Sequence, residues 1–369
     1  MSTKEVPIVI ITGYLGSGKT TLMQHILKQE KRKVALIVND MGSINIDASL
    51  LSTTGNKVAQ VEMVEMQNGC ICCTLRDEFM DQIERLSADK SIEAIFVEAS
   101  GISEPSSIAG AFLNYEEMND QTRVYLKSVV SVVDVDRIYR EFLYNLTSDE
   151  DAEDGDVINL IMDQIEFCNV MILNKTDLLS REQLEEVKTG LRALQQEAEM
   201  IECVNGQVDL EVLLDREEFD FEEVEAYSAV QRALNNCEHE DVKACVDEYG
   251  ISSFVFEEKR PFNREAFNRL IEEYPEVLIR TKGYIWFADD WNHVQLFEQA
   301  GRNASITELS EWVSAWPEEE LDKLEADFPD IREDWDEVYG DRCNQVVFIG
   351  KGYEKAEILK LLYDCVESA

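Results

Sequence analysis

A glycine-rich octapeptide near the start of the chain, GYLGSGKT at residues 13–20, constrains the fold more than any other feature of the sequence. It follows an apolar run at residues 6–11 and precedes an amphipathic segment at residues 20–28. This order is typical of a phosphate-binding loop that joins a buried strand to a helix. Glycines allow the tight turn in which successive N–H groups point at phosphate oxygens, and the helix N-terminus adds a favourable dipole. The pattern predicts a nucleoside triphosphate site.

The side chains of this loop have roles that follow from their chemistry. The Lys19 ammonium supplies a positive charge at the outer phosphates, and the Thr20 hydroxyl can ligate Mg²⁺. We therefore expect both residues to contribute to catalysis as well as to binding. The candidate nucleotide-binding residues of the loop are Gly13, Gly16, Ser17, Gly18, Lys19, Thr20 and Thr21.

Four further apolar runs have the length and composition of buried strands, at residues 33–39, 92–97, 129–133 and 170–173. Helical segments separate them. This alternation predicts an α/β fold with a mostly parallel sheet and helices on both faces. The nucleotide is then expected at the carboxyl ends of the strands.

Acidic residues follow two of these predicted strands. Asp40 comes after the strand at residues 33–39, and Glu98 closes the strand at residues 92–97. A carboxylate at a strand end beside the phosphate loop can hold Mg²⁺ or orient an attacking water. Both are candidate catalytic residues.

The strand at residues 170–173 runs into Asn174, Lys175, Thr176 and Asp177. An aspartate can accept from both the ring N–H and the exocyclic amine of guanine, whereas adenine offers no such pair of donors. The Lys175 stem can cover the plane of the base. This tetrapeptide, in the correct order after the phosphate loop, favours GTP over ATP.

Three of the nine cysteines, Cys70, Cys72 and Cys73, are packed into four positions after a glycine. Three thiolates around one centre suit Zn²⁺ or another thiophilic ion and leave one coordination position open. A redox pair or inert buried thiols are the alternatives. The scattered Cys168, Cys203, Cys343 and Cys365 are expected to be packing residues.

The net charge of −42, from 34 basic and 76 acidic side chains, limits the classes of partner. Such a polyanion is repelled by nucleic acid and by anionic membrane surfaces, so neither is an expected partner. No apolar stretch approaches the roughly 20 residues that span a bilayer. Nine cysteines in a chain without a secretion signal indicate a cytoplasmic protein and not a disulfide framework.

The ordered segments GYLGSGKTTL, VNDMG, NGCICCTLRDE, VEASGISEP and ILNKTDLL resemble the CobW-type family of metal-homeostasis P-loop GTPases. These are relatives of the hydrogenase and urease nickel-insertion GTPases. The resemblance continues in the second half of the chain, through RPF at residues 260–262, LIRTKG at 278–283 and VVFIG at 346–350.

The resemblance implies roles residue by residue. Lys19 and Thr20 would serve phosphate and Mg²⁺, with Glu98 as the second acid on the Mg²⁺ side. Asn174 and Asp177 would read guanine. Asp40 would fall in the first switch segment. Cys70, Cys72 and Cys73 would bind the metal.

The sequence departs from the family pattern at two places. Ser43 stands where many members carry a glutamate, so an accessory carboxylate ligand is missing there. The histidine-rich stretch of many members is reduced to a short acidic segment with Cys237, His239 and Cys245, which is either a second metal site or the remnant of a linker. Of the other histidines, His25 is expected on the first helix, and His293 is expected in a loop without a partner.

The chain of 369 residues is long for one core, and the sequence predicts two domains. We expect a P-loop GTPase domain at residues 1–225, an acidic linker at 226–250 and a smaller α+β domain resembling the CobW C-terminal domain at 251–369. Its predicted strands are residues 252–256, 278–287 and 346–349, and its predicted helices lie near 264–273 and 354–365. The five tryptophans, all in this half, are expected in its core and rim.

The predicted function is that of a GTP-hydrolysing metallochaperone, which delivers a divalent ion, zinc first among them, to a client metalloprotein. Its cofactors would be GTP, Mg²⁺ and Zn²⁺. Two alternatives stay open: a P-loop metabolic kinase, and a passive metal store whose nucleotide only stabilises the fold. The client is not named by the sequence, and a homodimer is also left open.

Overall fold

The computed structural model describes residues 5–29, 32–38, 61–65, 76–99, 101, 104–119, 122–144, 155–209, 211–214, 219–228, 250–301, 303–328, 331–332 and 335–367. Its contacts divide the chain into two compact units. Unit 1 comprises Met1–Arg140 and Leu160–Ala229, and unit 2 comprises Glu141–Asn159 and Val230–Ala369. The predicted linker lies almost entirely outside the described residues, so the boundaries at 225 and 250 stay predictions.

Unit 1 is built on a seven-stranded sheet in the order β3-β2-β4-β1-β5-β6-β7, in which every neighbouring pair is parallel. The strands are β1 (Val6–Thr12), β2 (Val34–Val38), β3 (Val61–Glu65), β4 (Ala94–Glu98), β5 (Val124–Asp134), β6 (Val170–Asn174) and β7 (Glu199–Glu202). Five of them, β1, β2, β4, β5 and β6, are buried almost throughout, as expected for strands covered on both faces. The predicted parallel α/β sheet is confirmed.

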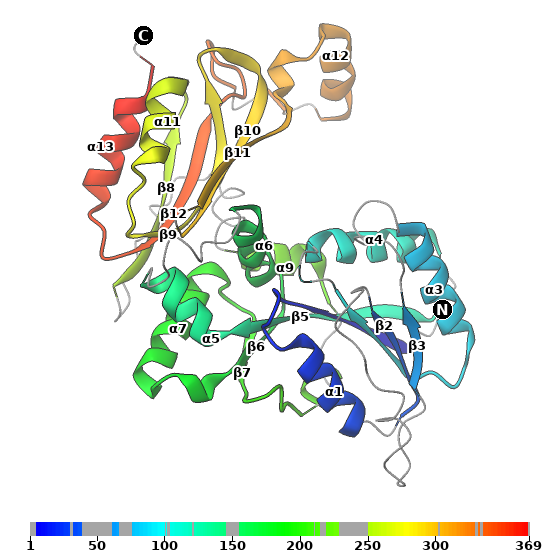
Figure 1. Ribbon diagram of the computed structural model, residues 1–369. Coiled ribbons are helices and arrows are strands. Elements are labelled where there is room, and N and C mark those ends of the chain that lie inside the picture. Colours follow the sequence, from blue (N-terminus) through cyan, green and yellow to red (C-terminus); the bar gives the residue numbers. More distant parts are fainter. Residues whose placement is uncertain are drawn as a thin grey trace. The chain divides into compact units, whose positions relative to one another are not determined.

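Helices cover both faces of this sheet, with α1 (Lys19–Gln29) on one side and α3 (Arg76–Ala88) and α4 (Pro105–Met118) on the other (Figure 1). Apolar side chains of α1 pack against alternate residues of β1, β2, β4, β5 and β6 in one core. The other helical segments of this half are α5 (Val135–Arg137), η1 (Ile138–Leu143), α6 (Gly155–Glu166), η3 (Thr176–Leu178), α7 (Arg181–Leu194), α8 (Glu211–Leu214) and α9 (Phe221–Tyr227). The division between the units falls within α6.

Unit 2 contains a five-stranded sheet in the order β11-β10-β9-β12-β8, and all of its pairs are antiparallel. Its elements are β8 (Ile251–Glu258), α11 (Arg264–Glu272), β9 (Leu278–Phe287), β10 (Asp290–Ala300), β11 (Asn303–Glu311), η4 (Val313–Ala315), α12 (Glu318–Asp327), β12 (Asn344–Lys351) and α13 (Lys355–Cys365). Figure 1 shows α11 and α13 together on one face of the sheet, where an aromatic core joins them to it. The predicted α+β architecture is confirmed.

The second face of this sheet carries part of the tryptophan set. Trp286 and Trp312 are buried in a small cluster with Val294, and Trp291 is 43% exposed. The alternation along β9 explains this, because Ile285 and Phe287 face the helices while Trp286 faces away. The expected division into core and rim is confirmed for these three tryptophans.

Four strands were not predicted from the sequence: β3, β7, β10 and β11. Each is short or rich in polar side chains, and β11 is largely exposed at the sheet edge. One expectation was therefore wrong. His293 lies in β10, and its Nδ1 is 3.0 Å from Oδ1 of Asp290.

No helix in the described part of the chain is long and apolar enough to cross a bilayer.

Candidate nucleotide site

The loop between β1 and α1 has the backbone conformation that its glycines were expected to allow. Gly13, Gly16 and Gly18 have φ values of 137°, 81° and 108°, in the region that favours glycine. A Cβ on Gly13 would lie 2.4 Å from the carbonyl oxygen of Val132 in β5. The loop is therefore pressed against the sheet, and a side chain at Gly13 would push it away.

Lys19, the first residue of α1, lies over this loop. Its side chain is 8% exposed, and Nζ donates to the carbonyl oxygens of Gly13 and Tyr14 at 2.5 and 3.1 Å. A cation held in this way is already desolvated and directed at the phosphate-binding loop. A phosphate can therefore replace the carbonyl oxygens as its partner. Thr21, by contrast, is exposed on α1.

Ser17 supplies an independent sign that the loop fits an anion. Its side chain is fully buried, and within the described residues its hydroxyl has no hydrogen-bond partner. A buried hydroxyl that lacks a partner costs free energy. Phosphate oxygens in the loop would satisfy it, so the residues present fit a nucleoside triphosphate.

Thr20 and Glu98 come together at the carboxyl ends of neighbouring strands. The Thr20 hydroxyl donates to Oε1 of Glu98 at 3.2 Å, and Glu98 is 2% exposed at the end of β4. A hydroxyl and a carboxylate beside a phosphate cradle are oxygen ligands that suit Mg²⁺. The donor set therefore fits the metal that a triphosphate requires.

The segment after Glu98 also reaches the loop, through Gly101. A Cβ on Gly101 would lie 3.1 Å from the backbone nitrogen of Leu15 and 3.4 Å from Nζ of Lys19. Its carbonyl oxygen accepts a hydrogen bond from Gln164 of α6 at 3.2 Å. In the sequence Gly101 stood out only as part of the segment VEASGISEP. Gly101 therefore lies against the end of the Lys19 side chain.

Asn174 connects three loops. It is 2% exposed, and its amide nitrogen donates to the backbone oxygen of Ser17 at 2.8 Å. Its side-chain oxygen accepts from the backbone N–H of Gly206 at 3.1 Å and from the Cys203 thiol at 3.4 Å. In this structure Asn174 thus ties the phosphate loop to the turn after β7, and no sequence signal pointed to Cys203 or Gly206.

Lys175 and Asp177 form the remainder of the predicted base-reading loop. Lys175 has φ 64° and pairs through Nζ with Oδ2 of Asp134 at 2.5 Å. Asp134 closes β5, and its other oxygen accepts the backbone N–H groups of Asp136 and Arg137. Asp177 is exposed. The loop is therefore anchored by Lys175, and the Asp177 carboxylate faces solvent, where a base can reach it.

Several predicted residues lie outside the described part of the chain. They are Asp40, Ser43, Cys70, Cys72, Cys73, Cys237, His239 and Cys245. Three of the four other cysteines are buried free thiols, as expected of packing residues: Cys168, Cys203 and Cys365. The fourth, Cys343, is a half-buried free thiol. Burial raises the pKa of the Cys203 thiol to about 11, so it stays neutral beside Asn174.

Comparison with known proteins adds the family to this geometry. The family described as "CobW/HypB/UreG, nucleotide-binding domain" matches residues 7–202, and the "Cobalamin synthesis protein cobW C-terminal domain" matches residues 251–366. A zinc-regulated GTPase metalloprotein activator from Dictyostelium discoideum is 33% identical over 370 residues, covering 94% of this chain and 76% of that protein.

Two further similarities concern the YjiA protein of Escherichia coli. Its sequence, named a zinc chaperone, is 25% identical over 85% of this chain and 91% of its own length. The crystal structure of the Zn(II)-bound YjiA GTPase aligns over 100% of both chains at 19% identity, with a TM-score of 0.41. The family assignment rests on the sequence matches.

Proposed function

Because the chain belongs to the CobW/HypB/UreG family, we propose that it is a GTPase metallochaperone, which binds zinc and delivers it to a client metalloprotein. The observation that carries the proposal is the Thr20–Glu98 pair beside the buried Lys19. Phosphoryl transfer needs a phosphate-binding loop, a fixed cation and a set of Mg²⁺ ligands. All three lie together at one edge of the sheet. A zinc-regulated GTPase metalloprotein activator and a zinc chaperone are among the relatives.

The proposed base is guanine, read by Asp177 while Lys175 covers its plane and Asn174 holds the loop. The anchoring of Lys175 by Asp134 supports this role, because it fixes the loop before the nucleotide arrives. An Asp177→Asn variant is expected to lose at least tenfold in GTP affinity while retaining its fold. Xanthosine triphosphate is the diagnostic probe, since its C2 oxygen accepts a hydrogen bond from the new amide. An unchanged preference for GTP over xanthosine triphosphate would contradict the assignment.

The proposed cargo site is formed by Cys70, Cys72 and Cys73. These cysteines belong to the connection between β3 and α3, and β3 ends at the same sheet edge as β1. Strands lie about 4.8 Å apart, which puts the end of β3 about 14 Å from the end of β1. Cys70 is the fifth residue after Glu65, the last residue of β3, a span of at most about 18 Å. The chain is therefore long enough for the proposed metal site to lie near the triphosphate.

We propose that the two sites are coupled. GTP hydrolysis removes the γ-phosphate contact, which relaxes the adjoining segment and loosens a thiolate site within it. Coupling of this kind is reciprocal: if GTP tightens zinc binding, zinc tightens GTP binding by the same factor. Equal GTP affinities with and without zinc, measured by titration calorimetry with a non-hydrolysable analogue, would refute the coupling.

A Lys19→Ala variant separates this proposal from the passive metal store. The variant loses the buried cation of the cradle, and we expect GTP turnover to fall at least a hundredfold, with zinc transfer to the client falling in parallel. A passive store transfers zinc at the same rate in both proteins. A kinase would instead yield a phosphorylated metabolite, which mass spectrometry of the reaction products detects.

The proposed location is the cytoplasm, where the four free cysteines of the described residues are stable as thiols. The client is proposed to be a metalloprotein of the same compartment. A homodimer is a separate expectation, which analytical ultracentrifugation with GTP and with GDP tests.

A further inference from the structure

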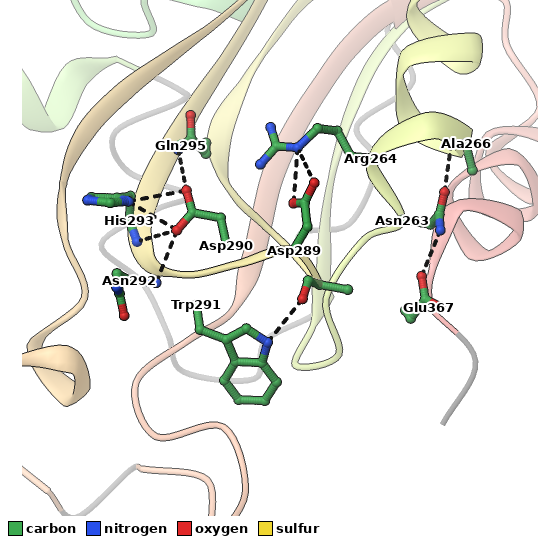
Figure 2. Close-up of polar contacts among 11 residues, drawn as sticks. Asn263, Arg264, Ala266, Asp289, Asp290, Trp291, Asn292, His293, Gln295 and Glu367 are labelled. Carbon is green, nitrogen blue, oxygen red and sulfur yellow. Dashed lines mark hydrogen bonds and ion pairs between the residues drawn. The ribbon is translucent and has the colours of Figure 1, made fainter.

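A second set of metal-ligating side chains lies in unit 2, at the start of β10. Asp290 opens this strand, His293 follows three residues later, and Glu308 comes from the neighbouring edge strand β11. Figure 2 shows the imidazole of His293 directed at the Asp290 carboxylate. Nδ1 of His293 is 3.0 and 3.2 Å from the two carboxylate oxygens, and 3.9 Å from Oε2 of Glu308.

We infer that Asp290, His293 and Glu308 form a divalent-cation site of the zinc class, separate from the cysteines. One imidazole nitrogen and carboxylate oxygens bind Zn²⁺ at about 2.0–2.2 Å, so tetrahedral donors lie roughly 3.3–3.6 Å apart. The distances from Nδ1 to the oxygens, 3.0–3.9 Å, bracket that spacing. Three protein ligands leave the fourth position for water or an incoming group.

The Asp290 carboxylate is held in place without an ion. Its Oδ1 accepts the backbone N–H groups of Asn292 and His293 at 3.2 and 3.3 Å. Its Oδ2 is contacted by Nε2 of Gln295, which is 7% exposed, at 3.5 Å. Such groups orient a ligand before the metal arrives and reduce the cost of binding.

Acidic side chains surround the imidazole of His293, and this negative charge favours the binding of a cation. His293 is paired in register with Glu311 and faces Asp290 and Glu308. In the described part of the chain, neither Asp290 nor Glu308 has a lysine or arginine partner. The adjacent Asp289 differs, because Arg264 contacts both of its carboxylate oxygens at 2.8 and 3.0 Å (Figure 2). Of two neighbouring acids, only one is thus neutralised by a guanidinium.

The site is expected to bind zinc more weakly than three thiolates do. Its donors are nitrogen and oxygen, and the side chain of Glu308 is 62% exposed. The alternative is a hydrogen-bonded His–Asp pair that only stabilises the start of the strand. That pair explains Asp290 and His293, but it gives Glu308 no function.

The test uses the full chain with Cys70, Cys72 and Cys73 all replaced by serine, so that the site of the proposed function is removed. Zinc binding is measured by equilibrium dialysis with metal analysis in the presence of Mg²⁺. We expect one equivalent to remain bound. Adding His293→Ala should weaken that binding at least tenfold, and Asp289→Asn, the matched control, should leave it unchanged.

Two further measurements separate the site from a structural pair. Glu308→Gln changes an exposed residue, so the fold is expected to persist, and it should weaken zinc binding several-fold. Zinc should also shift the imidazole ¹⁵N resonances of His293 more than those of His25. The inference is overturned if His293→Ala or Glu308→Gln binds zinc as the parent does, or if the His293 resonances do not move. A loss of cysteine-dependent binding alone bears on the proposed function and not on this site.

Discussion

At the phosphate loop, the side chain of Asn174 packs directly against Gly18. The side-chain amide of Asn174 donates a hydrogen bond to the backbone oxygen of Ser17. The same amide fills the space beside Gly18, where a Cβ would lie 2.2 Å from the amide nitrogen, so no larger residue fits there. The residue that a sequence motif assigns to the base is therefore also the residue that fixes the loop. The proposed function and the packing of the loop thus involve the same side chain.

Gly18→Ala and Gly16→Ala test this match. Both positions have positive φ, so alanine strains the backbone by about 1–2 kcal/mol in each. Only at Gly18 does the new methyl collide with Asn174, whereas nothing lies within 4 Å at Gly16. We expect Gly18→Ala to abolish binding of a fluorescent GTP analogue and Gly16→Ala to weaken it by about tenfold. Equal losses in the two variants would count against the role given to Asn174.

The Cys203 thiol makes the stability of unit 1 depend on pH. Burial raises its pKa from 9.0 to about 11. Between these values the unfolded chain has lost the thiol proton that the native chain keeps, so the free energy of unfolding falls as pH rises. Urea denaturation between pH 8 and pH 11 is expected to show this decline, with a shallower slope in Cys203→Ala. Identical slopes would mean that the thiol does not contribute.

At the scale of elements, the carboxyl ends of β1, β4, β5 and β6 explain why the site assembles where it does. Parallel strands end at one edge of the sheet, where Glu98, Asp134 and Asn174 are the last residues of β4, β5 and β6. Lys19 opens α1, after the loop that follows β1 at the same edge. These residues are far apart in sequence. The sheet order, with β1 between β4 and β5, makes them neighbours.

Gly283 allows two strands of unit 2, β9 and β12, to approach each other closely. It lies inside β9, and a Cβ there would be 2.1 Å from the backbone oxygen of Gln345 in β12. Gly283→Ala must separate the two strands, and we expect it to lower the free energy of unfolding by about 3 kcal/mol or more. Gly301→Ala, at a turn with nothing within 4 Å, should cost only about 1 kcal/mol. Chemical denaturation monitored by tryptophan fluorescence compares the two.

At the scale of the whole molecule, the net charge of −42 opposes an anionic ligand. Lys19 acts at contact distance, whereas most acids act over longer distances that salt screens. The association rate of GTP–Mg²⁺ is therefore expected to rise when the ionic strength increases from about 0.01 to 0.15 M, as the Debye length falls from about 30 to 8 Å. Stopped-flow fluorescence measures this rate. A rate that falls with salt would show that a positive local field dominates.

The parallel sheet, the phosphate loop and the second, α+β half could all be predicted from the sequence alone. Their signals are local, because glycine conformations and buried apolar runs depend on neighbouring residues. Polar strands such as β10 and β11 gave no such signal, since only pairing makes them strands. Only the folded structure shows that Asn174 meets Ser17 and that His293 lies near Glu308. Asn174 and Ser17 are 157 residues apart, and Glu308 comes from the strand beside that of His293. Their proximity follows from sheet order and register, which a linear pattern does not contain.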